Sequence, residues 1–71
     1  MDKQTLTRSL RQSVNGADFL NKNQVKRFMG FSSKDGVNLF LEGVEYYCQG
    51  KQHLYHVSDL AQRIMDRRVM Q

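Results

Sequence analysis

Cys48, His53 and His56 are the side chains of this sequence best suited to binding a metal ion. A structural zinc site usually needs one more ligand than this cluster offers, and its ligands commonly come in closely spaced pairs. His53 and His56 also fall three residues apart in an expected strand, where side chains alternate, so they should point to opposite faces. The sequence therefore predicts a buried thiol and two histidines of a sheet, and no metal site.

The acidic side chains would serve as catalytic carboxylates only if two of them met in an apolar pocket. The seven Asp and Glu are instead scattered over expected helix starts and polar faces, where capping or solubility explains them. A chain of 71 residues also leaves little room for a pocket that excludes water. We therefore predict that the protein is not an enzyme and carries no cofactor.

The aromatic side chains offer a third chemistry, the stacking of nucleotide bases. Their periodic spacing favours the core instead, because a domain of this size needs large apolar side chains in its interior. We expect Phe28, Phe31, Phe40 and one of Tyr46 and Tyr47 to be buried, and the other tyrosine to face solvent.

The balance of charge favours an anionic partner. The 11 Lys and Arg exceed the seven Asp and Glu, and the net charge of +4 suits nucleic acid or an anionic membrane surface. A core this small rarely supplies more than about 3–5 kcal/mol, and the one cysteine excludes an internal disulfide. No apolar run approaches the roughly 20 residues of a membrane span, and no secretion signal is evident, so we expect a cytoplasmic protein that is not bound to a membrane.

The N-terminal part of the chain has a narrow apolar stripe at helical spacing, which predicts a helix over residues 2–14. Such a short helix persists in water only when it packs on the domain or on a partner. We expect residues 1–18 to form a helical or flexible segment, and residues 19–71 to form one domain. The stripe consists of Leu6, Leu10 and Val14.

The clearest local pattern is the run from Leu20 to Val25. It contains Asn21 and Gln24 at the positions of a capping box, with hydrophobic-staple residues at its two ends. This pattern predicts a helix that begins at Lys22 and ends at Gly30, a residue type suited to a left-handed helix end.

A second helix is expected over about residues 33–42, with Ser33 as a candidate N-cap. Its core stripe is Val37, Phe40 and Leu41, and Gly36 is a weak point that costs up to about 1 kcal/mol relative to alanine.

The last third of the chain predicts a hairpin and a closing helix. Residues 44–49 and 52–56 are rich in aromatic and β-branched residues and flank a Gly50-Lys51 turn. The closing helix should begin with Ser58 as N-cap and end near Arg67, since cations suit the negative end of a helix.

The four-residue turn from Gly30 to Ser33 joins two capped helices and has the length of a helix-turn-helix corner. In the order and spacing of its elements the chain resembles the phage and transposon excisionase family of MerR-like winged helix-turn-helix proteins. The family's pattern looks like L-T-x-x-[EQ]-V-A-x-x-L-G-[VI]-S, a recognition helix, a small strand, a G-[KR]-x-x-[YF] wing and a closing helix begun by Asp. The matching runs are Phe19 to Ser32, Val37 to Gly43 and Tyr46 to Leu60.

The resemblance implies a mainly helical fold with a small β-hairpin, and a small architectural protein that binds and bends double-stranded DNA at an attachment site or promoter. Its partners would be that DNA, a recombinase or integrase, and further copies of itself on the DNA. The recognition helix would be about 33–42 and the wing about 49–53, with Asn38 able to read adenine and the cations neutralising phosphates. The implied DNA-binding residues are Lys26, Arg27, Ser33, Lys34, Asn38, Gln49, Lys51, Gln52 and His53.

Four residues of the expected recognition helix depart from the family's pattern or oppose DNA binding. Leu39 stands where members commonly carry Arg or another polar residue, Gly36 stands where they carry a side chain, and Asp35 and Glu42 reduce the positive charge. Base readout by this helix is therefore expected to be poor.

Two alternative functions stay open. The fold would also suit a protein-interaction module, in which Leu39 and the N-terminal apolar stripe form a contact surface, or a phage or mobile-element transcriptional regulator that uses the same residues. An exposed Leu39 that continues into other apolar surface favours protein binding. A shared face for Lys34, Asn38 and Lys51 favours DNA binding.

Overall fold

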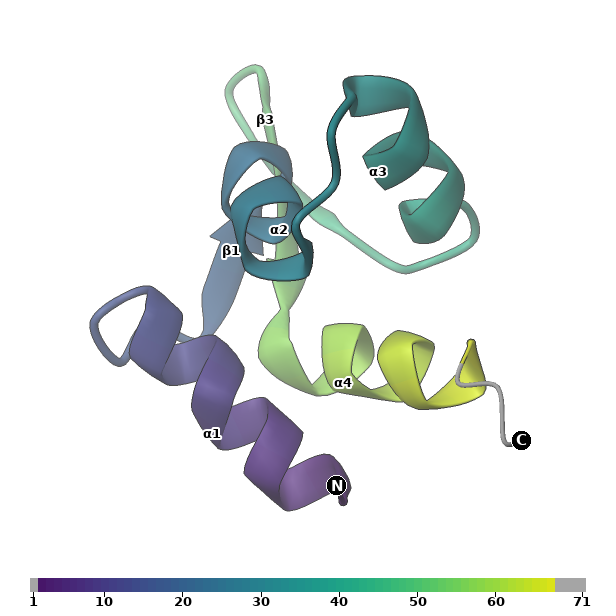
Figure 1. The fold of residues 1–71 in the computed structure, drawn as a ribbon. Coiled ribbons are helices and arrows are strands. Elements are labelled where there is room, and N and C mark those ends of the chain that lie inside the picture. The colour runs from purple at the N-terminus through teal and green to yellow at the C-terminus, as the bar shows by residue number, and fades with distance from the viewer. Residues whose placement is uncertain (1, 68–71) are drawn as a thin grey trace.

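The computed structural model describes residues 2–67, which form four helices and a three-stranded antiparallel sheet (Figure 1). The prediction of helices with a small hairpin holds, although the sheet has one strand more than predicted. The tail of the 19–71 segment, residues 68–71, lies outside the described residues. Within residues 2–67, no helix combines the length and apolar character needed to cross a membrane. The elements are α1 (Lys3–Ser13), β1 (Phe19–Asn21), α2 (Lys22–Met29), α3 (Lys34–Leu41), β2 (Tyr47–Gln49), β3 (Gln52–His56) and α4 (Val57–Asp66).

Helix α2 begins and ends as its sequence pattern predicts. The Asn21 side chain accepts a hydrogen bond from the backbone N–H of Gln24 at 2.9 Å, and the Gln24 side chain accepts one from the Asn21 N–H at 2.9 Å. This reciprocal capping box satisfies two backbone donors that a helix start leaves unpaired. Gly30 closes the helix with a φ of +76°, in the left-handed region that favours glycine.

Helix α3 is held by its cap and by an aromatic contact. The Ser33 hydroxyl oxygen accepts a hydrogen bond from the Gly36 N–H at 3.4 Å. The Phe31 ring lies over Gly36 so closely that a Cβ there would approach the ring to 3.3 Å. Phe31 also packs on Phe40, with ring centroids 5.6 Å apart. The lack of a side chain at Gly36 therefore allows the Phe31 ring to pack against α3, which explains why a glycine stands inside this helix.

The sheet has the strand order β1-β3-β2, with β3 in the centre. Strand β1 was not predicted, because three residues carry no periodic signal of their own. It exists through pairing with β3, in a register that places Asn21 opposite Leu54. The predicted first hairpin strand, 44–49, is wrong in its first half: strand β2 begins only at Tyr47, and residues 44–46 belong to the connection that follows α3.

Helix α4 follows β3 without an intervening loop, and the predicted N-cap Ser58 is wrong. His56 caps the helix instead, since its Nδ1 accepts a hydrogen bond from the Ser58 N–H at 3.1 Å. The helix therefore starts earlier than predicted, and its first residue, Val57, is fully buried.

The N-terminal helix α1 lies alongside α4 below the sheet (Figure 1). Its residues Leu6 and Leu10 are buried in the same core as α4. The apolar stripe proposed as a contact surface for a partner is thus occupied within the fold. The core consists of Leu6, Leu10, Leu20, Val25, Val37, Phe40, Leu41, Tyr55, Val57, Leu60 and Ala61.

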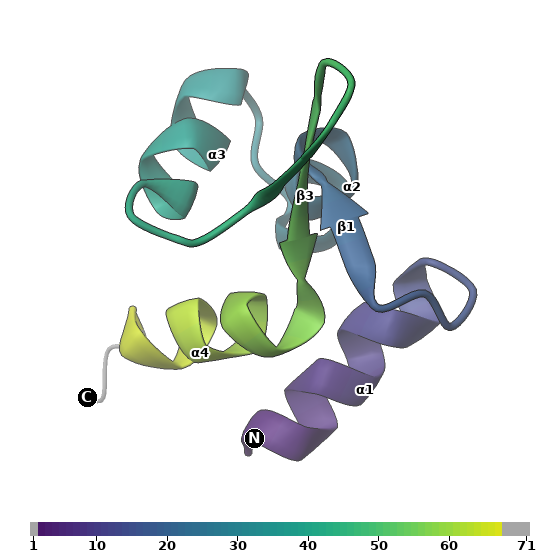
Figure 2. The ribbon, with the colours of Figure 1, turned by 180° about the vertical axis from the view of Figure 1, so that it is seen from behind.

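The hairpin differs from the prediction in which side chains it buries. Both Tyr46 and Tyr47 are exposed, by 49% and 59%, and Tyr55 of the central strand occupies the core instead. Cys48 is exposed rather than buried. Tyr47 and Cys48 belong to an edge strand, so only one neighbouring strand shields them. Figure 2 shows that, within residues 2–67, no helix covers the sheet face turned away from α2.

Candidate nucleic-acid interface

A groove of about 290 Å³ lies between the start of α2, one side of α3 and the β2–β3 hairpin. Its polar lining consists of lysines and side-chain amides together with one histidine, and the buried Val37 contributes to its wall. The lining residues are Asn21, Lys22, Asn23, Lys26, Lys34, Val37, Asn38, Lys51, Gln52 and His53.

The pairing of β1 with β3 positions the α2 side of the groove. Asn21 is both the last residue of β1 and the N-cap of α2, and it lies opposite Leu54 of β3. The first turn of α2 is therefore fixed beside the hairpin. Lys22 and Lys26 are four residues apart and share one face of α2, which places both ammonium groups on the groove side.

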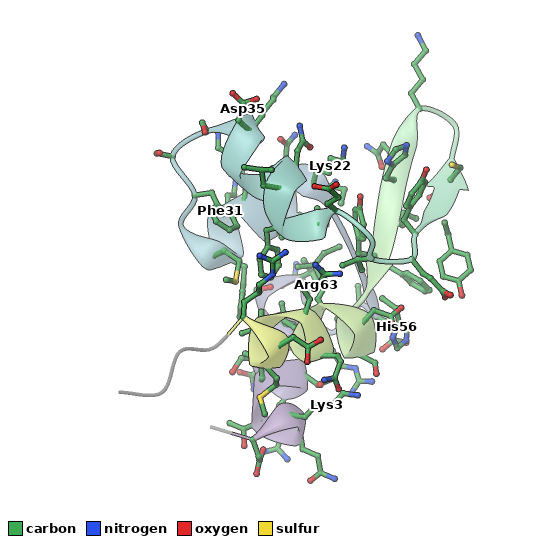
Figure 3. All side chains as sticks on the ribbon, turned by 90° about the vertical axis from the view of Figure 1, so that its right-hand side faces the viewer. Lys3, Lys22, Phe31, Asp35, His56 and Arg63 are labelled. Atoms are coloured by element: carbon green, nitrogen blue, oxygen red, sulfur yellow. The ribbon has the colours of Figure 1, made fainter. Side chains whose placement is uncertain are left out.

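Helix α3 and the hairpin form the remaining walls. Lys34 and Asn38 are also four residues apart, so they share the side of α3 that faces the groove. Lys51 lies in the turn of the hairpin, where Gly50 takes a φ of +62°. In Figure 3, Lys22 lies beside α3 on its hairpin side, Asp35 lies at the top of α3, and Lys3 is far away on α1.

The groove concentrates positive charge. Four lysines line it, and no carboxylate within residues 2–67 does. Within residues 2–67, the ion pair that forms joins Arg11 and Asp18 at 2.9 Å, away from the groove. No lysine of the groove is therefore paired with a carboxylate of the described residues. Positive charges gathered in a concave surface attract anions. An extended polyanion would neutralise several of these charges at once.

A second, more apolar hollow adjoins the groove and shares Lys22, Asn38 and His53 with it. The Tyr46 ring stacks on the His53 ring, with centroids 4.2 Å apart and planes 17° apart. Leu39 of α3 lines this hollow and is 66% exposed.

The buried wall of the second hollow includes Tyr55. Burial raises the pKa of the Tyr55 phenol, and the neighbouring Tyr46 and Cys48 act in the same direction. Tyr55 therefore stays neutral at physiological pH and adds no charge to the site.

Six of the nine DNA-binding residues expected from the sequence line the groove: Lys26, Lys34, Asn38, Lys51, Gln52 and His53. The other three lie elsewhere. Arg27 lines an adjoining hollow, which shares Asn23 and Lys26 with the groove. Ser33 uses its hydroxyl to cap α3, and Gln49 is an exposed residue of β2.

The groove also contains Asn21, Lys22 and Asn23, which were not among the expected site residues. Only the pairing of β1 with β3 brings the start of α2 to the hairpin. The polar run Asn21-Lys22-Asn23 at a helix start was visible in the sequence, but its neighbour in space was not.

Comparisons with protein-family models, with curated proteins and with solved structures find no match to this chain. The site must therefore be interpreted from its own chemistry. Across the described part of the chain, no three His, Cys, Asp or Glu side chains come together as ligands for a metal ion. What the arrangement offers is a charged, amide-rich groove between a helix and a hairpin.

Proposed function

We propose that this chain is a winged helix-turn-helix protein that binds double-stranded DNA, with α3 as recognition helix and the β2–β3 turn as wing. The observation that carries the proposal is the convergence of four lysines from α2, α3 and the hairpin on one groove. The short turn between α2 and α3, followed by a hairpin and a closing helix, also agrees with the element order of the winged helix-turn-helix pattern.

The groove suits one strand of a DNA backbone. In a helix-turn-helix complex the second helix enters the major groove with its N-terminal residues toward the bases. A hairpin beside that helix would then reach across the sugar-phosphate backbone that borders the major groove. Lys34 and Lys51 lie on the two sides of the groove and would neutralise phosphates between them. Lys22 and Lys26 would contact the same strand from α2.

The test is a titration of a labelled random-sequence duplex, followed by fluorescence anisotropy at about 0.1 M salt. The variant Lys34→Ala/Lys51→Ala should bind more weakly by roughly tenfold for each lysine, the effect of losing one phosphate contact. The matched control is Lys3→Ala/Arg8→Ala, which removes the same charge from α1, far from the groove. Equal losses in both variants, or no binding by the unaltered chain, would contradict the proposal.

The resemblance to excisionases supports a narrower form of the proposal. The chain would bind and bend attachment-site DNA so that a recombinase excises a phage or other mobile element. A transcriptional regulator would use the same groove, so the two roles must be separated by a different measurement. Where an integrase gene adjoins the gene of this chain, a recombination assay with that integrase should require the chain for excision. Unchanged excision without it, together with repression of a nearby promoter, would favour the regulator.

Exposed apolar side chains support a second candidate, a protein-interaction module. Leu39 is 66% exposed and lines the same hollow as Tyr46. Phe19 and Tyr47 form an edge-to-face pair on the uncovered sheet face, with centroids 5.5 Å apart. For this candidate, Leu39→Ala or Tyr47→Ala should abolish partner capture while duplex binding stays unchanged.

A further inference from the structure

We infer that α3 reads an A·T base pair, with the Asn38 amide on adenine and the Leu39 side chain against the methyl group of thymine. This inference rests on the proposed function, because it assigns the base pair that the same site would recognise.

The hydrogen-bonding groups on the exposed side of α3 are the first argument. Asn38 is exposed, lines the groove, and offers one acceptor and two donor hydrogens on its amide. Adenine presents an acceptor at N7 and a donor at N6 in the major groove, which this amide matches with two hydrogen bonds. Guanine presents two acceptors, N7 and O6, and is read by a donor fork such as that of arginine.

The neighbours of Asn38 oppose guanine. Asp35 is exposed on the same helix and Glu42 is exposed at its C-cap, and ionised carboxylates only accept hydrogen bonds. Leu39 has no hydrogen-bonding group in its side chain. Lys34, the first residue of α3 and its one cation, lines the groove with Lys51 and is assigned here to a phosphate of the backbone between them.

The exposure of Leu39 is the second argument. It is 66% exposed on a helix whose other apolar side chains, Val37, Phe40 and Leu41, are all buried. The fold therefore does not use this side chain. In the major groove, thymine alone presents a methyl group, and apolar side chains read it by contact. A leucine directly after an adenine-reading Asn38 fits that base pair.

The composition of the groove agrees with this assignment. The lining includes the amides of Asn21, Asn23, Asn38 and Gln52, and no arginine within residues 2–67 lines it. Arg27, the arginine of α2, lines an adjoining hollow that shares Asn23 and Lys26 with the groove. Arginine, whose donor fork pairs with guanine, is thus absent from the described lining. The lysines that line the groove are assigned here to phosphates, and the adenine-reading side-chain type is abundant.

The experiment has two stages. Duplexes that bind the chain are first selected from a random pool and sequenced, which should yield sites with a fixed A·T pair. In the selected duplex, 7-deazaadenine then replaces that adenine and removes N7, or deoxyuridine replaces that thymine and removes the methyl group. The 7-deazaadenine change should weaken binding by about fivefold or more, since a bidentate base contact contributes roughly that much discrimination. The deoxyuridine change should weaken it measurably.

Single variants test which side chain contacts adenine N7 and which contacts the thymine methyl group. Asn38→Ala should lose the response to 7-deazaadenine and keep the response to deoxyuridine, and Leu39→Ala should do the reverse. Both side chains are exposed, and circular dichroism will verify that the variants fold. Selected sites fixed as G·C, or responses that both variants retain, would overturn the inference while duplex binding still supports the proposed function. Absence of binding to every duplex, or preference for single strands, would overturn both.

Discussion

At the scale of single residues, His56 links the sheet to the last helix. Its Nδ1 caps α4 by accepting from the Ser58 N–H, and its ring contacts Phe19 with centroids 5.1 Å apart. Loss of an N-cap costs about 1 kcal/mol. The variant His56→Ala should therefore lower the melting temperature by roughly 4–8 °C in a domain of this size, measured by circular dichroism.

The control for this residue is His56→Asn, which keeps a side-chain acceptor of a type favoured at N-caps. It should recover part of the melting temperature lost in His56→Ala. If the two variants melt at the same temperature, the hydrogen bond to Ser58 contributes nothing, and His56 acts only through its contact with Phe19.

At the scale of elements, a helix or strand could be predicted when the residues that specify it lie within the element itself. Helix α2 was predictable because Asn21, Gln24 and Gly30 specify its two ends through hydrogen bonds and backbone angles within the element. Strand β1 was not, because only its pairing with β3 makes it a strand. The same pairing determines which residues form the groove. Lys26, Lys34 and Lys51 could be predicted as binding residues from the sequence, whereas the position of Lys22 beside the hairpin depends on the contact between β1 and β3.

Helix α1 is an integral element of the fold, and its packing on α4 predicts a large effect of truncation. Leu10 is 1% exposed, and replacing a buried leucine by alanine costs about 2–5 kcal/mol. Because a core this small supplies only about 3–5 kcal/mol, Leu10→Ala should leave much of the protein unfolded at 25 °C. Urea denaturation followed by circular dichroism measures this.

Leu39→Ala is the matched control for Leu10→Ala, since it makes the same chemical change at an exposed position. Its effect on the free energy of unfolding should stay within about 0.5 kcal/mol. Similar stability of the two variants would show that α1 does not pack on α4 in solution.

Helix α3 carries acidic side chains that oppose the proposed DNA binding, and removing one should strengthen it. Asp35 is exposed in the first turn of α3, close to Lys34 of the groove. A carboxylate about 4 Å from a phosphate costs roughly 1 kcal/mol in water. Asp35→Asn should therefore raise the affinity for every duplex by up to about fivefold, measured by anisotropy.

Asp59 provides the control for Asp35, because it is likewise an acid in the first turn of a helix, but in α4. Asp59→Asn should leave duplex affinity unchanged. An increase confined to one duplex sequence in Asp35→Asn would indicate that this carboxylate contacts a base rather than repelling phosphates.

At the scale of the whole molecule, the distribution of charge matters more than its sum. The net charge of +4 is modest, and residues 19–43 hold four basic side chains against two acidic ones. The fold separates these signs: three of the four basic side chains line the groove, where Lys51 of the hairpin joins them, whereas Asp35 and Glu42 do not line it. A weakly basic chain thus presents a strongly cationic strip on one side.

The dependence of binding on salt tests that strip as a unit. A protein that neutralises four phosphates should lose affinity with a slope of about −3.6 in a plot of log K against log salt concentration. The variant Lys22→Ala/Lys26→Ala should reduce the slope by about 1.8, because each phosphate contact contributes about 0.9. Lys3→Ala/Arg8→Ala, with the same change of charge on α1, should keep the slope of the unaltered chain.

A steeper slope of the unaltered chain would mean that cations outside the groove, such as Arg27, also contact the DNA. A slope that Lys22→Ala/Lys26→Ala leaves unchanged would remove α2 from the interface and confine it to α3 and the hairpin.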